Sequence, residues 1–125
     1  MGFVLLKDGC EHPIPQDLRA VFEQIVLAFV EGDYRLAGRD IGRVASIDDE
    51  LSAFIAESVS AYGSSLAPLN PKVWERSIYA HDTGERWSVL VDLTTEDEEV
   101  SDLVLHADLI LEPDLSIRVW SVHVP

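Results

Sequence analysis

Apolar residues in the first half of the chain recur at helical spacing over two stretches. In the first stretch, residues 17–31, they fall at i, i+3, i+4, i+7, i+8, i+11 and i+12, which places them on one continuous stripe. The residues of this stripe are Leu18, Val21, Phe22, Ile25, Val26, Phe29 and Val30. Pro15 precedes the stretch and Gly32 follows it, as is common at helix ends. The pattern predicts a helix that buries its stripe against another layer.

The second stretch, residues 47–62, predicts another amphipathic helix. Ser46 is positioned to cap its first turn, with Asp49 three residues later, and Gly63 suits the end of a helix. The predicted apolar face consists of Leu51, Phe54, Ile55, Val59 and Tyr62.

The segment between these helices, residues 33–45, is predicted to be a short helix or a loop, because two glycines interrupt it. Arg35, Arg39 and Arg43 would align on one side of a helix and form a basic patch. Such a patch would contact an anion or an acidic peptide, or its members would pair with the protein's own carboxylates. The second interpretation is favoured, because acidic residues outnumber Lys and Arg by 23 to 9.

The second half of the chain alternates apolar and polar residues, which is typical of β-strands. Four runs are predicted to be strands, 73–81, 87–93, 103–111 and 115–124, and residues 3–6 a short edge strand. In the run 103–111, Leu103, Leu105, Ala107, Leu109 and Leu111 are assigned to the core face. In the last run, one face is assigned Leu115, Ile117, Val119, Ser121 and His123, and the other Ser116, Arg118, Trp120, Val122 and Val124.

Helices followed by strands predict an α+β fold, in which two main N-terminal helices pack on one face of a roughly four-stranded antiparallel meander sheet. The runs 87–93 and 103–111 form its central hairpin. With 125 residues, the chain is predicted to be a single domain over 1–125. A hydrophobic content of 47% argues against disorder.

The loop of the central hairpin concentrates negative charge in Glu96, Asp97, Glu98 and Glu99, with Asp102 just beyond it. The whole chain has a formal net charge of −14, which disfavours binding to nucleic acid or to an anionic membrane. The same charge would steer a basic protein toward it. The loop is therefore either a solvated surface that keeps the sheet soluble or a docking surface for a basic partner.

Trp120 is the predicted apolar anchor of such a surface, because its place in the alternation directs it away from Ile117 and Val119. Partner binding is accordingly assigned to Glu96, Asp97, Glu98, Glu99, Asp102 and Trp120.

No catalytic residue, cofactor or metal site is assigned. The loop carboxylates lack the spacing and the central glycine of an EF-hand, and the four histidines are too scattered for a zinc pattern. Cys10 and His12 lie two apart, but no oxyanion loop accompanies them. His106, Asp108 and Asp92 are the candidates for an enzyme or ligand site, because they are predicted to sit mid-strand on one face.

The compartment indicated by the sequence is the cytoplasm. Cys10 is the one cysteine, which excludes an intrachain disulfide and fits a reducing environment. No signal peptide is visible, and no apolar run approaches the ~20 residues of a membrane helix.

Several segments together carry a resemblance to known proteins: residues 29–34, Tyr62-Gly63, residues 87–93 leading to 101–103, and the C-terminal Val122-His123-Val124. On these segments the chain resembles a family of small, uncharacterised acidic bacterial proteins. In size and charge it is similar to immunity proteins of contact-dependent and other polymorphic toxin systems. The resemblance implies a binding protein and transfers no functional residue.

Three functions follow as expectations. The first is a cytoplasmic immunity protein that neutralises a basic toxin domain, such as a nuclease, by occluding its active site. The second is a small ligand-binding domain or enzyme with a pocket between helices and sheet. The third is a subunit that forms a homodimer through a sheet face. The sequence itself leaves the oligomeric state open.

Overall fold

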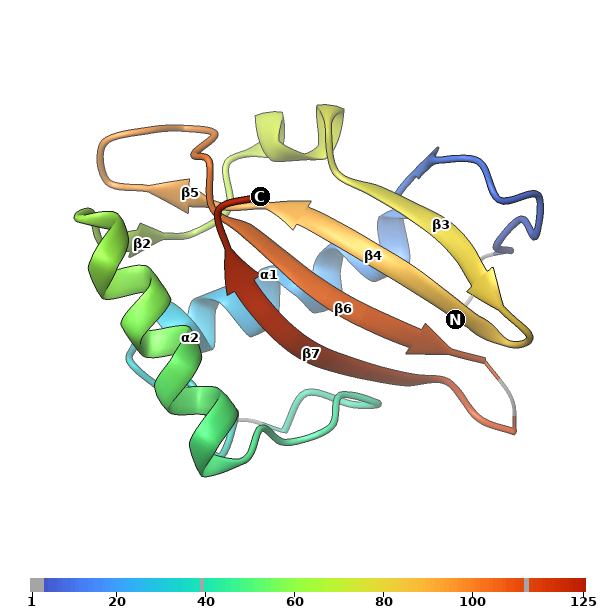
Figure 1. Ribbon diagram of the computed structural model, residues 1–125, viewed down its shortest axis with the longest axis horizontal. Coiled ribbons are helices and arrows are strands. Elements are labelled where there is room, and N and C mark those ends of the chain that lie inside the picture. The colour runs from blue at the N-terminus through green and yellow to red at the C-terminus, as the bar shows by residue number, and fades with distance from the viewer. Residues whose placement is uncertain (1–3, 39, 112) are drawn as a thin grey trace.

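The described residues form two α-helices and two antiparallel sheets, which confirms the α+β class (Figure 1). The computed structural model describes residues 4–38, 40–111 and 113–125. The larger sheet has five strands in the order β1-β3-β4-β6-β7, and the smaller pairs β2 with β5. The helices are α1 (Gln16–Val30) and α2 (Asp49–Tyr62), and η1 (Pro71–Glu75) is a 3₁₀ helix. The strands are β1 (His12–Pro13), β2 (Leu66–Ala67), β3 (Ile78–Thr83), β4 (Arg86–Asp92), β5 (Thr94–Thr95), β6 (Val104–Ile110) and β7 (Ser116–His123).

The predicted four-stranded meander corresponds to β3, β4, β6 and β7, and the structure adds β1 at the edge beside β3. The edge strand expected at residues 3–6 is not found, because Val4–Leu6 is not paired and Phe3 lies outside the described residues. Leu6 is held instead through its backbone. Its N–H donates to the Tyr79 hydroxyl at 3.1 Å, and its carbonyl accepts from Trp87 Nε1 at 3.0 Å.

Helix α1 crosses one face of the large sheet, where its predicted stripe forms the centre of the core (Figure 1). Phe22, Ile25 and Phe29 are almost completely buried, and only Val30 at the helix end is largely exposed. The sheet side of this core includes Trp87, Val89, Val91, Leu103, Leu105, Ala107 and Leu109, and from β7 Ile117, Val119 and Val122. Burial of each large apolar side chain contributes about 1.5–3 kcal/mol, so this face provides most of the stability.

Helix α2 packs along the edge strand β7 rather than across the middle of the sheet (Figure 1). Its cap is Asp48, whose side chain accepts from the Leu51 N–H at 2.8 Å, so the capping role predicted for Ser46 is wrong. A helix at the edge buries a narrower stripe. Ile55 and Val59 are buried, while Phe54, predicted to be on the apolar face, is 48% exposed.

The connection between the helices is irregular, with Leu36 and Arg43 at positive φ. Its end runs beside β7, where Val44 bridges Ile117 and the Ala45 N–H donates to the Ile117 carbonyl at 2.9 Å. Arg35 pairs with Asp49 at 3.0 Å, as the internal-pairing interpretation predicts, and Arg39 lies outside the described residues.

The strand predicted over 73–81 is wrong in its first half. Pro71 and the Asn70 side chain, which accepts from the Lys72 N–H, start the 3₁₀ turn η1 instead. Ser77 then ties this turn to the sheet, because its hydroxyl donates to the Val73 carbonyl at 2.6 Å and accepts from the Asp92 N–H.

A β-bulge in β7 reverses the predicted alternation of the last strand. Ala107 pairs with Val119 and His106 pairs with Ser121, so Trp120 is the extra residue. Beyond the bulge, Val122 pairs with Leu105 on the core face and is fully buried, whereas Ser121 and His123 lie on the other face, with His106 and Val104. The faces assigned to Ser121, Val122 and His123 were therefore wrong.

Candidate partner-binding surface

The backbone of the acidic loop is held in place at both ends. The Glu96 N–H donates to the Ser65 carbonyl at 3.0 Å, next to the pairing of β5 with β2. The Thr94 hydroxyl donates to the Glu99 carbonyl at 2.7 Å, which closes the loop. The loop is thus an ordered turn on a small sheet.

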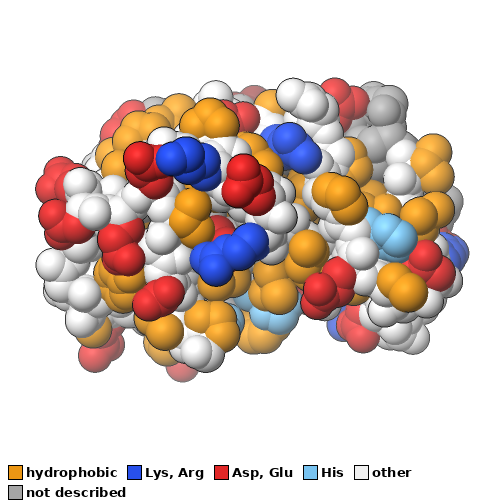
Figure 2. Space-filling model, turned by 90° about the horizontal axis from the view of Figure 1, so that it is seen from above, with side chains coloured by type: hydrophobic (Ala, Val, Ile, Leu, Met, Phe, Trp, Pro, Cys, Tyr) orange, Lys and Arg blue, Asp and Glu red, His pale blue; other side chains and the backbone are white. Residues whose placement is uncertain are grey.

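Three of the four loop carboxylates contact side chains of this chain. Tyr62 donates to Glu98 at 2.5 Å, Ser64 donates to Asp97 at 2.8 Å, and Lys72 pairs with Glu99 at 2.6 Å. The hydrogen bond to Glu98 raises the pKa of Tyr62, and that to Glu99 raises the pKa of Lys72. These contacts fix the carboxylates while leaving all four residues exposed. Figure 2 shows acidic side chains gathered at the end of the molecule that carries β2 and β5.

Asp102 lies beside the loop. Its N–H donates to the Tyr62 hydroxyl at 3.0 Å, so Tyr62 bridges Glu98 and Asp102. Asp102 also lines a shallow hollow of about 390 Å³ with Val104 and Val124. Because Val104 belongs to the sheet face that α1 does not cover, this hollow connects the loop with that face, which we call the open face.

Trp120 lies on the open face and is 43% exposed. Its ring is 4.0 Å, centroid to centroid, from that of His106. His106 Nε2 is buried without a hydrogen-bond partner in the described structure. Burial lowers the pKa of His106, which nearby Asp108 opposes and His123 reinforces. The structure therefore brings together the loop and Asp102, and it places the Trp120 anchor on a separate surface.

The candidates for catalysis lie outside a pocket between helices and sheet or are paired with other side chains. His12 contacts Asp8 at 2.8 Å rather than Cys10, and this contact lowers the pKa of Asp8. His106 and Asp108 lie on the open face, so a pocket between helices and sheet would not include them. Asp92 pairs with Arg76 at 3.1 Å.

Metal and membrane features are absent from residues 4–38, 40–111 and 113–125. No three His, Cys, Asp or Glu side chains there are grouped closely enough to hold a metal ion. Nor does any helix in this part combine the length and the apolar character needed to cross a bilayer.

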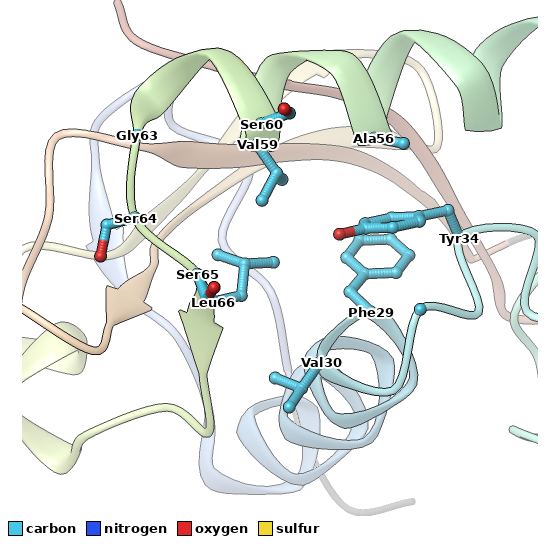
Figure 3. A pocket seen from close by; sticks show the side chains of 11 residues that line it. Phe29, Val30, Tyr34, Ala56, Val59, Ser60, Gly63, Ser64, Ser65 and Leu66 are labelled. Carbon is cyan, nitrogen blue, oxygen red and sulfur yellow. The ribbon is translucent and has the colours of Figure 1, made fainter.

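Sequence reasoning missed a hollow of about 490 Å³ between the ends of α1 and α2 (Figure 3). Phe29, Val30 and Tyr34 line it from one side, and Ala56, Val59 and Leu66 from the other. The amphipathic patterns predict both helices but not that their C-terminal ends meet, so no sequence signal reveals this hollow.

Comparison with protein families finds one match. A family model described as Domain of unknown function (DUF7668) matches residues 26–125, which includes the end of α1, all of α2 and most of the large sheet. Comparison with curated proteins and with solved structures finds no match.

Proposed function

Since the chain belongs to the DUF7668 family, whose description assigns no function, we propose one from the geometry: the protein is a cytoplasmic immunity protein that binds a basic toxin domain. It neutralises the toxin, for example a nuclease, by covering its active site. The observation that carries this proposal is the ordered acidic loop, which presents Glu96, Asp97, Glu98 and Glu99 on a backbone fixed at both ends.

Ordering of the loop favours binding, because little conformational entropy remains to be lost when a partner docks. A nuclease holds phosphate groups with lysine and arginine side chains, and the loop offers carboxylates to the same side chains. Glu98 and Asp97 accept neutral donors from Tyr62 and Ser64, which leaves their negative charge intact, whereas Glu99 pairs with Lys72. The net charge of −14 steers such a partner and repels nucleic acid and anionic membranes.

Exposed charge pairs contribute about 0–1 kcal/mol each, so an apolar anchor is also needed. Trp120 fills this role, because it is exposed on the open face and stacks on His106. The shallow hollow lined by Asp102, Val104 and Val124 lies between the loop and that face. A partner that covers both would bury a continuous surface.

The test is co-purification of the chain with the product of the gene immediately upstream, at low and high salt, together with protection of cells that express that product. We expect a complex at low salt that weakens as salt rises, and survival of the protected cells. Absence of binding at low salt combined with absence of protection would reject the immunity function.

A further inference from the structure

The hollow between α1 and α2 lies at the C-terminal ends of both helices. Val30 closes α1 and Gly63 follows the last turn of α2, and both residues line it. Some of the last carbonyl groups accept from the N–H groups that follow, Phe29 from Gly32 and Ser60 from Gly63, and the dipole of each helix still leaves a partial negative charge of roughly half an electron at its end. Neither helix has a basic residue in its last turn to offset this charge. Two helix ends therefore create a negative potential at one site.

The walls of the hollow add apolar and aromatic surface. The rings of Phe29 and Tyr34 are in tilted contact, with centroids 5.3 Å apart, and Val59 and Leu66 face them (Figure 3). Aromatic rings attract cations electrostatically, and aliphatic side chains accommodate the hydrocarbon body of a ligand. The volume lies within the range of roughly 300–1,000 Å³ that is typical of ligand pockets.

A polar group is also available inside the hollow. The Tyr34 hydroxyl points toward the space beside Val59 and Leu66 (Figure 3). Within the described part of the chain, this hydroxyl has no hydrogen-bond partner. It can accept a hydrogen bond from an ammonium or guanidinium N–H.

The surroundings of the hollow are acidic. Among the described residues that line it there is no lysine or arginine. Its rim touches the acidic loop twice, through the contact of Ser64 with Asp97 and that of Ser65 with Glu96. An anion would be repelled by this environment, whereas a cation would be attracted by it.

We propose that the hollow between α1 and α2 is a binding site for an organic cation, an alkylammonium or guanidinium group carried on an apolar body. The cation lies near the two helix ends, and the apolar body packs against Phe29, Val59 and Leu66. This site does not depend on the immunity function, because the residues that line it include neither the four loop carboxylates nor Trp120.

The test is an NMR titration of the full chain with benzylammonium, using benzyl alcohol as a neutral probe of the same shape. We expect saturable shifts at the amides of Gly32, Gly63 and Ser65, and binding of the alcohol at least about tenfold weaker. Equal binding of the two probes would overturn the proposal, as would shifts that remain confined to Glu96–Glu99 or no saturable shift at all.

Two lysine variants of α2 provide a matched comparison. Ala56→Lys places an ammonium group at the half-buried wall of the hollow, whereas Ala53→Lys adds the same charge at an exposed position of the same helix. We expect A56K to weaken benzylammonium binding about tenfold or more and A53K to change it less than about twofold. Equal effects of the two variants would show attraction by net charge alone and would contradict a site.

A second ligand, N-acetyl-lysine methylamide, distinguishes a cation carried by a partner protein from a free amine. Tighter binding of this blocked lysine than of benzylammonium would identify a side chain of a partner protein, and the reverse order would identify a free amine. Both outcomes support an organic-cation site. If neither ligand produces shifts that A56K removes, the site does not exist.

Discussion

The two faces of the large sheet are formed by the same strands but differ in how deeply their side chains are buried. On the covered face, Val89, Leu105 and Val119 are buried in the core beneath the helices, in a surface made almost entirely of apolar side chains. On the open face, the neighbouring positions carry Asp108, His106 and Trp120, which are partly or largely exposed. Strand alternation places both sets one residue apart. Stability therefore comes mainly from the covered face, and the open face and the acidic loop at its end remain exposed for recognition.

The largest expected effect is the loss of a side chain from the covered side. Phe22→Ala should lower the free energy of unfolding by about 3–5 kcal/mol, because Phe22 is fully buried and its removal leaves a cavity. Phe54→Ala is the control, since Phe54 is 48% exposed and should cost less than about 1 kcal/mol. Urea denaturation of both variants measures the difference. Similar losses would mean that Phe54 of α2 contributes as much to the core as Phe22 of α1, which contradicts this prediction.

Trp120→Ala, on the open face, should have the opposite effects: a small change in stability and a larger loss of partner binding. We expect the free energy of unfolding to change by less than about 1 kcal/mol, because the side chain is 43% exposed. Binding to the basic partner should weaken by about 2 kcal/mol, which is typical of an aromatic anchor. Calorimetry of the complex and urea denaturation of the free chain separate these effects. A variant that loses stability but binds normally would place Trp120 with the structural residues.

Much of the fold could be predicted from the sequence because burial follows regular periods. The stripe of α1 and the alternation of Trp87, Val89 and Val91 depend only on helical and strand spacing. The bulge at Trp120 could not be predicted, because a single inserted residue leaves no mark in composition and reverses every later side chain. The turn η1 was missed for a similar reason, since Val73 and Trp74 suit a strand as well as a buried turn.

The candidate surface was predictable in part. Charge density alone singles out residues 96–99, and the structure shows how they are fixed. Their contacts with Tyr62, Ser64 and Lys72 join positions that are far apart along the chain, so local patterns do not reveal them. The hollow between the helices depends on where two chain segments end relative to each other, which only the packed structure defines.

The smallest expected effect concerns pH and the open face. The pKa of His106 is lowered, so the unfolded chain takes up a proton at higher pH than the folded chain does. This histidine therefore favours the folded state above its ordinary pKa of about 6.5, and the contribution is lost as the pH falls from that value through the lower pKa of the folded state. We expect the stability of wild type to decline more between about pH 7 and pH 5.5 than that of His106→Gln. Parallel pH profiles in urea denaturation would contradict this prediction.

The most direct test of the binding account is the association rate with the basic partner as a function of ionic strength. A loop variant combines Glu96→Gln, Asp97→Asn, Glu98→Gln and Glu99→Gln. A control variant neutralises four exposed acidic residues elsewhere: Glu11→Gln, Glu23→Gln, Glu57→Gln and Asp114→Asn. Both variants have the same net charge. The account predicts that the loop variant associates at least about tenfold more slowly than the control at low salt, with the difference shrinking at high salt. Equal rates for the two variants would show that the acidic loop has no specific role in binding.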